Sequence, residues 1–246
     1  MITPPAKAGS FPTRGEIMET NVTLCSIMLN EESFLPIFLE NIKDIFQEYV
    51  FVDGGSTDRS VEFVEQAGYK VHQIPFKMDF SEQKNNALNL ARTKWRMVMD
   101  IDETMSKGMR LVMQLLVGSS KLEGHVVSFF RDNYLDGISL DDYPLDFQVR
   151  LFDDSVYFQR PVHEIPYYPD KTVVKFFAGR LYHKKDSFRQ YRNNLIYELI
   201  LRGVREIPPM GEGIFNENGR LRKVKLWPGR KIEVLNEYLE GEILNK

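Results

Sequence analysis

The nine residues from Trp95 to Glu103, WRMVMDIDE, constrain the fold more than any other stretch of the chain. A run of large apolar residues ends abruptly in Asp100, Asp102 and Glu103, a pattern typical of a buried strand whose carboxylates lie at one edge of a sheet. Ligands of open α/β sheets bind at that edge. Because alternate residues of an extended backbone point to the same face, we expect the Asp100 and Asp102 carboxylates to converge.

Two unpaired carboxylates side by side are costly, and proteins commonly relieve that cost with a divalent cation held through oxygen ligands. The alternative is a solvated acidic turn after a strand. For an isolated Asp-x-Asp the solvated turn is the more frequent explanation. The surrounding sequence therefore has to decide between a metal site and a turn.

The composition indicates one substantial core. The chain has 246 residues, 43% of them hydrophobic and 12% aromatic, enough for one large domain. No apolar run approaches the roughly 20 residues that span a bilayer, and the first residues lack the apolar core of a signal peptide. We therefore expect a cytoplasmic protein, with peripheral contact at the inner membrane face as an option. The single cysteine, Cys25, lies in an apolar run and is expected to be a buried, unreactive thiol.

The charge of the chain is unevenly distributed. The net charge is −3, yet residues 171–231 hold 15 Lys and Arg against 5 Asp and Glu. Such a basic segment suggests an anionic partner: a phosphorylated glycan lipid, a membrane surface or nucleic acid. Ordinary scatter of surface charge is the competing explanation.

Hydrophobic periodicity predicts an α/β fold for the first hundred residues. We expect strands at 22–28, 48–53, 70–74 and 95–103, and helices at 34–46, about 60–64 and 81–91. Asp58 or Ser60 is the expected cap of the second helix. Strands that alternate with helices indicate a parallel sheet with crossover helices.

The pattern changes after Glu103. We expect a helix at 109–117, strands at 124–131, 148–152, 156–158 and 173–181, and a helix at 188–202. These pieces predict a mixed β extension. The expected organisation is a mobile arm at 1–20, one domain at 21–200 with a nucleotide half (21–106) and an acceptor half (107–200), and a basic loop with a final helix at 201–246, packed on that domain.

Several short motifs resemble those of one enzyme family when they are taken in order. NEES follows the first strand, VDGGSTDRSVE the second, FSEQKNNALNLA lies on the third helix, and MDIDE stands at the centre. With QVRLF and VHE further on, they resemble the family 2 glycosyltransferases of the GT-A fold, an α/β nucleotide-sugar-binding fold. The last two segments resemble those of short bacterial members that add glucose or a similar sugar to the lipopolysaccharide inner core. The likeness covers about residues 20–200.

The resemblance implies a nucleotide-sugar donor, with a UDP-sugar first among the candidates, and Mg²⁺ or Mn²⁺ at its diphosphate. Asp102 would bind the metal directly, and Asp100 would reach the ribose, or the metal through water. Asp53 resembles the family's contact to base and ribose. Lys84 stands where the family commonly places a cation near the base, and Glu31 would lie against the nucleotide. For each of these residues, a cap or a surface charge is the alternative.

An inverting transfer also needs a carboxylate that takes the proton of the attacking hydroxyl. Glu164 is our candidate, because its neighbours would give it an apolar setting that raises its basicity; they are Pro161, Val162, His163, Ile165 and Pro166. Asp146 is the reserve, and a structural ion pair is the alternative role for Glu164. His183 stands where this fold often supplies a third metal ligand. Arg150 could meet phosphate oxygens or pair with a buried carboxylate.

Three functions are consistent with these residues. The first is an inverting, metal-dependent glycosyltransferase. The second is a nucleotidyltransferase, which would normally carry a Gly-rich basic loop where this chain has NEES. The third is a catalytically silent module that binds nucleic acid or membrane, which the basic segment supports and the retained carboxylates oppose.

For the glycosyltransferase, the sequence predicts an anionic acceptor. One basic cluster follows His183 and a second lies further on; together they comprise Lys184, Lys185, Arg189, Arg192, Arg220, Arg222, Lys223 and Lys225. A phosphorylated lipopolysaccharide core or another surface glycan is favoured, and DNA with a hydroxylated base is the alternative. In the DNA case a flipped base could stack on an aromatic ring. The candidate rings are Tyr134, Tyr143, Tyr167 and Tyr168.

Overall fold

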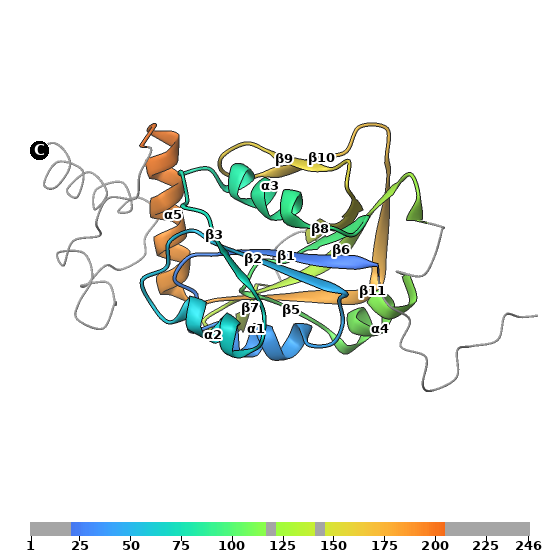
Figure 1. Ribbon diagram of the computed structural model, residues 1–246, viewed down its shortest axis with the longest axis horizontal. Coiled ribbons are helices and arrows are strands. Elements are labelled where there is room, and N and C mark those ends of the chain that lie inside the picture. The colour runs from blue at the N-terminus through green and yellow to red at the C-terminus, as the bar shows by residue number, and fades with distance from the viewer. Residues whose placement is uncertain (1–20, 117–121, 141–145, 205–246) are drawn as a thin grey trace, which may run out of the picture.

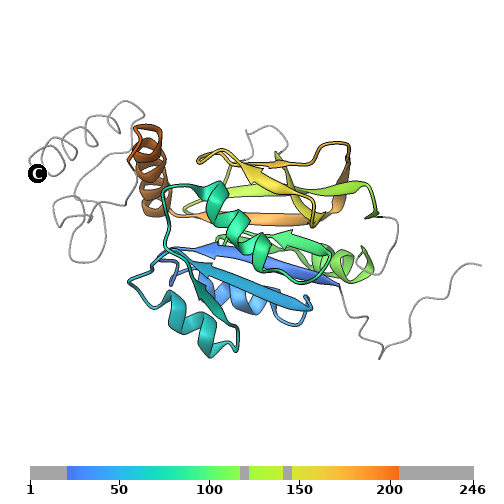
Figure 2. The same cartoon turned by 45° about the horizontal axis from the view of Figure 1, so that its top comes forward.

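The computed structural model describes residues 21–116, 122–140 and 146–204. The predicted arm at 1–20, most of the predicted C-terminal segment, the second basic cluster and Tyr143 lie outside the described residues. The α/β class expected from the sequence is the one observed, and the described elements surround one mixed sheet (Figures 1 and 2).

The N-terminal half is a parallel sheet with crossover helices, as predicted. Its strands run in the order β3-β2-β1-β4. They are β1 (Val22–Met28), β2 (Glu48–Asp53), β3 (Val71–Gln73) and β4 (Trp95–Val98). The helices between them are α1 (Leu35–Ile42), α2 (Ser60–Gln66) and α3 (Phe80–Leu90). The bounds of β1 and β2 are those predicted from the sequence.

The C-terminal half extends this sheet with mixed strand directions. The order continues β4-β8-β6-β11-β5, with β7 beside β6. The strands are β5 (Glu103–Met105), β6 (His125–Leu135), β7 (Ile138–Ser139), β8 (Asp146–Asp153) and β11 (Thr172–Lys185). A separate antiparallel pair consists of β9 (Tyr157–Gln159) and β10 (Ile165–Tyr167). The helices are α4 (Lys107–Leu116) and α5 (Ser187–Leu201).

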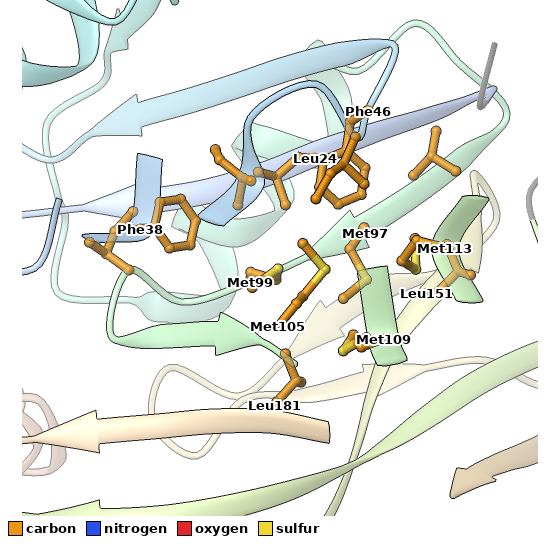
Figure 3. Packing of buried hydrophobic residues seen from close by; sticks show 14 of the residues in the cluster. Leu24, Phe38, Phe46, Met97, Met99, Met105, Met109, Met113, Leu151 and Leu181 are labelled. Carbon is orange, nitrogen blue, oxygen red and sulfur yellow. The ribbon is translucent and has the colours of Figure 1, made fainter. Parts of the chain in front are cut away.

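The core lies on both faces of the parallel strands because both faces are covered. Leu24, Phe51 and Met97 point to the face with α1, whereas Cys25 and Val98 point to the face with α3. Figure 3 shows the first of these two clusters, in which Met97, Met99, Met105, Met109 and Met113 pack beside Leu24 and Phe38. Strands buried on both faces read as continuous apolar runs, which is why β1, β2 and β4 were recognisable in the sequence.

The prediction of one continuous strand over 95–103 is wrong. Strand β4 ends at Val98, and a turn follows in which the amide of Glu103 donates to the carbonyl of Asp100 at 2.9 Å. The chain then enters β5, which pairs with β11 on the far side of the sheet. Asp100 and Asp102 therefore lie on a turn, where the alternation of an extended strand does not apply.

Two smaller differences concern the ends of elements. The N-cap position of α2 is Arg59, whose side chain makes no capping bond. Asp58, one of the two predicted caps, accepts at 2.9 Å from the amide of Ser60, the first residue of the helix, and its other oxygen accepts from the amide of Glu32. Ser60, the other predicted cap, instead accepts from the amide of Glu31. The short strands β5, β7 and β10 were not predicted, because strands of two or three residues leave no periodicity in the sequence.

The prediction for Cys25 is confirmed. Its side chain is buried, and its thiol contacts the carbonyl oxygen of Ala87 at 3.6 Å. Burial raises the pKa of the Cys25 thiol to about 12, so it is not a nucleophile near neutral pH. Among the helices of the described ranges, none has the length and apolar character needed to cross a membrane.

Candidate active site

A cavity of about 850 Å³ lies at the end of the sheet where β1 and β4 finish. Helix α5 stands at the same end (Figures 1 and 2) and contributes to its wall. Eight of the nine site residues predicted from the sequence line this cavity: Glu31, Lys84, Asp100, Asp102, Asp146, Arg150, Glu164 and His183. The structure thus brings together residues as far apart in the chain as Glu31 and His183.

Asp53 is the exception. Its carboxylate is 2% exposed and accepts hydrogen bonds from the amides of Gly55 and Ser56 and from the Ser56 hydroxyl, which lies 2.5 Å away. Asp53 is not among the residues that line the cavity. In this structure, Asp53 shapes the loop after β2.

Glu31 is positioned by the loop on which it lies. Asn30 has a φ of 55°, a left-handed conformation that asparagine tolerates better than most residues. The Asn30 side chain accepts from the amide of Thr57 at 2.7 Å, and the Ser60 hydroxyl accepts from the amide of Glu31 at 2.7 Å. These bonds fix the NEES turn against the loop after β2, and they leave the Glu31 carboxylate pointing at Arg189 and Arg192 of α5.

Lys84 is a buried cation between two carboxylates. Its Nζ lies 3.0 Å from Oδ1 of Asp100 and 2.7 Å from Oε1 of Glu164. Burial would lower the pKa of Lys84, but the charges of Asp100 and Glu164 outweigh that effect and raise it. Burial would likewise raise the pKa of Asp100, yet Lys84 and Arg150 hold it well below its usual range.

Glu103 is the centre of an ion-pair cluster and was not among the predicted site residues. Its carboxylate is fully buried, contacts Nη2 of Arg150, lies 3.3 Å from Nη1 of Arg131 and accepts from the amide of Asp100. Arg150 also reaches Oδ2 of Asp100 at 2.9 Å. Of the two roles left open for Arg150, the structure therefore shows the pairing with buried carboxylates.

Asp146 is saturated by three donors. Its Oδ1 accepts from Gln148 at 2.5 Å, and its Oδ2 accepts from Arg131 at 2.8 Å and from Asn133 at 3.1 Å. Burial raises the pKa of Asp146, but the hydrogen bond from Gln148 and the charge of Arg131 lower it by more, so that the net shift is downward. A carboxylate in this setting is a poor proton acceptor.

Glu164 lies on a loop held against the rest of the domain. Val162 is buried against α5, and the carbonyl of Pro161 accepts from the amide of Phe80 at 3.0 Å. Residues Arg160 and His163 both have positive φ, a strained conformation that is common at functional sites. The apolar setting expected for Glu164 is wrong, since its carboxylate, which is 15% exposed, forms with Lys84 an ion pair of the kind that was the alternative role for this residue.

Asp102 faces His183 rather than Asp100. Nε2 of His183 lies 3.3 Å from Oδ2 of Asp102, and Nδ1 of His183 lies 2.7 Å from Oδ1 of Asn133. Because Asn133 donates its amide to Asp146, its oxygen faces the imidazole, which then donates through Nδ1, so that in the neutral form of His183 the lone pair is on Nε2. A lone pair and a carboxylate oxygen that face each other are suited to a shared cation.

The donor set fits a divalent cation through Asp102 and His183. Oδ1 of Asp102 has no hydrogen-bond partner within the described residues, although it is buried. Within the same residues, no cluster of three His, Cys, Asp or Glu side chains is arranged as a complete metal site. Asp100, the remaining candidate ligand, has one oxygen on Lys84 and the other on Arg150. The expectation that the two aspartates converge on one object does not hold in this structure.

The residues of the first basic cluster differ in their surroundings; they are Lys184, Lys185, Arg189 and Arg192. Arg189 and Arg192 are paired with Glu31, and Arg189 also reaches Asp102. Lys185 lines the cavity, whereas Lys184 is exposed and does not. Tyr134 is the one candidate stacking residue among the described cavity-lining side chains.

The comparisons with known proteins identify the family. The family described as Glycosyl transferase family 2 matches residues 23–205, well over half of the chain. The chain belongs to this family. Its α/β fold, a mixed sheet with crossover helices, is of the class that the motifs predicted. The order of the motifs along the sequence, rather than any one of them, carried that information.

Individual relatives share only part of their length with this chain. It is 30% identical over 146 residues to a TPR repeat-containing protein of Synechococcus elongatus, a match that covers 58% of this chain and 35% of that protein. It is 33% identical over 117 residues to the lipopolysaccharide core biosynthesis glycosyltransferase LpsC of Rhizobium meliloti, covering 45% of this chain and 42% of LpsC. The matched parts are therefore less than half of these relatives.

Among solved structures, one similar chain is glucosyl-3-phosphoglycerate synthase from Mycobacterium tuberculosis, in complex with Mn²⁺, UDP and glucosyl-3-phosphoglycerate. The identity is 14%, the TM-score is 0.48, and the match covers 89% of this chain and 95% of the synthase.

Proposed function

We propose that this protein is an inverting, metal-dependent glycosyltransferase that moves a hexose or similar sugar from a nucleotide-sugar, with a UDP-sugar as the first candidate, to a hydroxyl of an anionic acceptor. Membership of Glycosyl transferase family 2 supports glycosyl transfer. The observation that carries the proposal is the single cavity wall shared by Glu164, Asp102 and His183. These residues provide a proton acceptor and a cation site on one space large enough for a donor and part of an acceptor.

In this proposal Asp102 and His183 hold Mg²⁺ or Mn²⁺, with the remaining coordination positions taken by water and the donor diphosphate. When bound, the ion would supply positive charge where the leaving diphosphate develops negative charge. Asn133 orients the imidazole of His183 through its 2.7 Å hydrogen bond. Glu31 and Lys84, which the sequence placed against the nucleotide, line the same cavity.

Glu164 is the proposed general base. The acceptor hydroxyl would transfer its proton to Glu164 while its oxygen bonds to the anomeric carbon and the bond from that carbon to the diphosphate breaks. Glu164 is preferred to Asp146 because Asp146 already accepts three hydrogen bonds, whereas Glu164 has one cation as partner and lines the cavity. Lys84 fixes the carboxylate of Glu164 in the cavity wall.

The acceptor is proposed to be a glycan or glycolipid. The partial similarity to a lipopolysaccharide core glycosyltransferase supports this class, and Lys185 provides a cation in the cavity wall for an anionic group. We also propose that the protein acts in the cytoplasm, in peripheral contact with a membrane, a location that would suit such an acceptor.

A nucleotide-sugar binding screen tests the donor. A ligand present at 100 times its dissociation constant adds about 2.7 kcal/mol to the stability of the protein. We expect UDP-sugars with Mn²⁺ to raise the melting temperature more than GDP- or dTDP-sugars do. A larger rise in melting temperature with the sugar of another nucleotide would identify that nucleotide, rather than UDP, as part of the donor. No rise with any nucleotide-sugar would contradict the proposed function.

A further inference from the structure

Arg189 occupies the space between two buried carboxylates of the cavity. Its Nε lies 2.9 Å from Oδ2 of Asp102, and its Nη1 contacts Oε2 of Glu31. The guanidinium carbon also lies 4.8 Å from the centre of the Phe34 ring. Helix α5 thus places a buried cation against both the NEES turn, which carries Glu31, and the turn after β4, which carries Asp102.

Oδ2 of Asp102 faces two groups at once. It is the oxygen that accepts from Arg189, and it is also the one that lies 3.3 Å from Nε2 of His183. A divalent cation shared by Asp102 and His183 would meet the guanidinium at close range. The two positive charges would repel strongly there, because Asp102 and Arg189 are both buried and water screens such charges poorly.

We propose that Arg189 is a built-in cation that competes with the divalent metal for Asp102. The proposal rests on the metal site of the proposed function. Without ligands, Arg189 neutralises Asp102 and keeps the affinity for metal low. When the metal binds between His183 and Oδ2 of Asp102, Nε of Arg189 leaves that oxygen, and the guanidinium keeps Glu31 as a partner.

The competition couples the metal to the nucleotide. A diphosphate in the cavity would offer Arg189 an anionic partner in place of Asp102, since guanidinium groups bind phosphate oxygens well. Nucleotide binding would then free Asp102 for the metal, and each ligand would raise the affinity for the other. A protein of this kind holds its metal tightly only when the donor is present.

Arg192 supplies a matched control. It lies one turn further along α5, with Nη2 at 3.3 Å from Oε1 of Glu31 and Nη1 at 3.0 Å from the carbonyl of Asn30. No hydrogen bond or ion pair between Arg192 and Asp102 is found in the described structure. Its charge still acts on Asp102 from a longer distance, so removing it alters the same helix and the same glutamate and weakens the positive field at Asp102 without taking away a bonded partner of that carboxylate.

The test measures Mn²⁺ binding by electron paramagnetic resonance, with and without UDP, for the wild type, Arg189→Gln, Arg189→Lys and Arg192→Gln. We expect Arg189→Gln to bind Mn²⁺ about tenfold more tightly than the wild type without UDP, because a buried carboxylate has lost its counterion. UDP should strengthen Mn²⁺ binding in the wild type and have much less effect in Arg189→Gln. Arg192→Gln should tighten Mn²⁺ binding far less than Arg189→Gln does, and Arg189→Lys, which keeps the charge, should remain close to the wild type.

The outcomes separate the two proposals. If Arg189→Gln binds Mn²⁺ no more tightly than the wild type while Asp102→Asn abolishes binding, the competition is refuted and the metal site stands. If Arg189→Lys binds as tightly as Arg189→Gln, the charge is not the cause and the competition is again refuted. If no variant binds Mn²⁺ with or without UDP, the metal site and the competition both fail.

Discussion

The Nζ atom of Lys84 lies 2.7 Å from Oε1 of Glu164, so a lysine of α3 holds a carboxylate that is 80 positions further along the chain. The same ammonium group lies 3.0 Å from Asp100. The two halves of the domain therefore meet at one buried cation. In the proposed mechanism, the position of the base depends on a residue that the sequence had placed near the nucleotide.

Replacing Lys84 by methionine should lower the stability of the protein. The change leaves Asp100 and Glu164 without their shared cation, and breaking a buried pair in this way costs about 3–5 kcal/mol. The measurement is urea denaturation at pH 7. Lys94→Met is the control, since Lys94 forms an exposed pair with Glu123 at 2.6 Å and its loss should have little effect on stability.

The effect of Lys84→Met should also depend on pH. The pKa of Asp100 is held low in the folded protein, so its contribution to stability is present above the ordinary value of about 3.9 and is lost as the pH falls through the lower folded value. The difference in unfolding free energy between wild type and Lys84→Met should therefore shrink as the pH falls below about 4. An equal difference at pH 7 and at low pH would contradict the role of Lys84 as partner of ionised Asp100.

Glu164→Gln should leave donor binding nearly unchanged and lower turnover about 10²- to 10⁴-fold, the usual contribution of a general base. Asp146→Asn is the matched comparison and should lower turnover less, because Asp146 holds Arg131, Asn133 and Gln148 in place. Donor affinity and turnover are measured separately for both variants. A greater loss of turnover in Asp146→Asn would reverse the two roles.

The sequence predicted the parallel half of the fold well, because strands buried on both faces are continuous apolar runs with turn residues at their ends. It also predicted which polar residues would meet at the carboxyl end of the sheet, since the fold class determines that edge. The individual contacts were not predictable in the same way. The turn at 99–102 sends Asp100 to Lys84 and Asp102 to His183, and a turn has no periodicity that reveals such directions.

Arg131, Asn133 and Glu103 show what sequence reasoning missed. They connect Asp146, His183 and Arg150 across strands that are distant in the chain. The only signal in the sequence was the length of the strand that begins near residue 125, which was expected to end at 131 and continues to 135. With the longer strand, Arg131 and Asn133 would have been recognised as alternate residues on one face of the sheet.

Replacing Lys185 by glutamine should weaken binding of the acceptor and leave binding of the donor unchanged. Lys185 lines the cavity, and no ion pair is found for it within the described residues. We expect a higher KM for an anionic acceptor and an unchanged affinity for the nucleotide. Lys184→Gln is the control, because the exposed Lys184 does not line the cavity.

Salt dependence distinguishes the two acceptor classes. Transfer to DNA should fall by several powers of ten between about 50 and 200 mM salt, whereas transfer to a phosphorylated glycan should fall far less.

The Lys185 prediction has its own contrary outcome. If the acceptor KM is the same in Lys185→Gln as in the wild type, Lys185 does not bind the acceptor.

Gly179→Ala should destabilise the fold without touching the cavity. A Cβ atom at Gly179 would lie 2.9 Å from Cα of Met109, so α4 would have to move away from β11. Overpacking of this kind costs about 1–3 kcal/mol. Thermal denaturation measures the change, and an unchanged melting temperature would mean that α4 and β11 are not packed as closely as described.

The most direct test of the proposed function is the release of UDP from UDP-glucose, in the presence of Mn²⁺, by the wild type and by Asp102→Asn. The substitution keeps the volume of the side chain and removes the charge that a cation needs. We predict that the wild type releases UDP, and that either Asp102→Asn or a metal chelator lowers the rate at least about a hundredfold. Release of UDP at the wild-type rate by Asp102→Asn, or in the presence of the chelator, would contradict the metal-dependent mechanism proposed for this site.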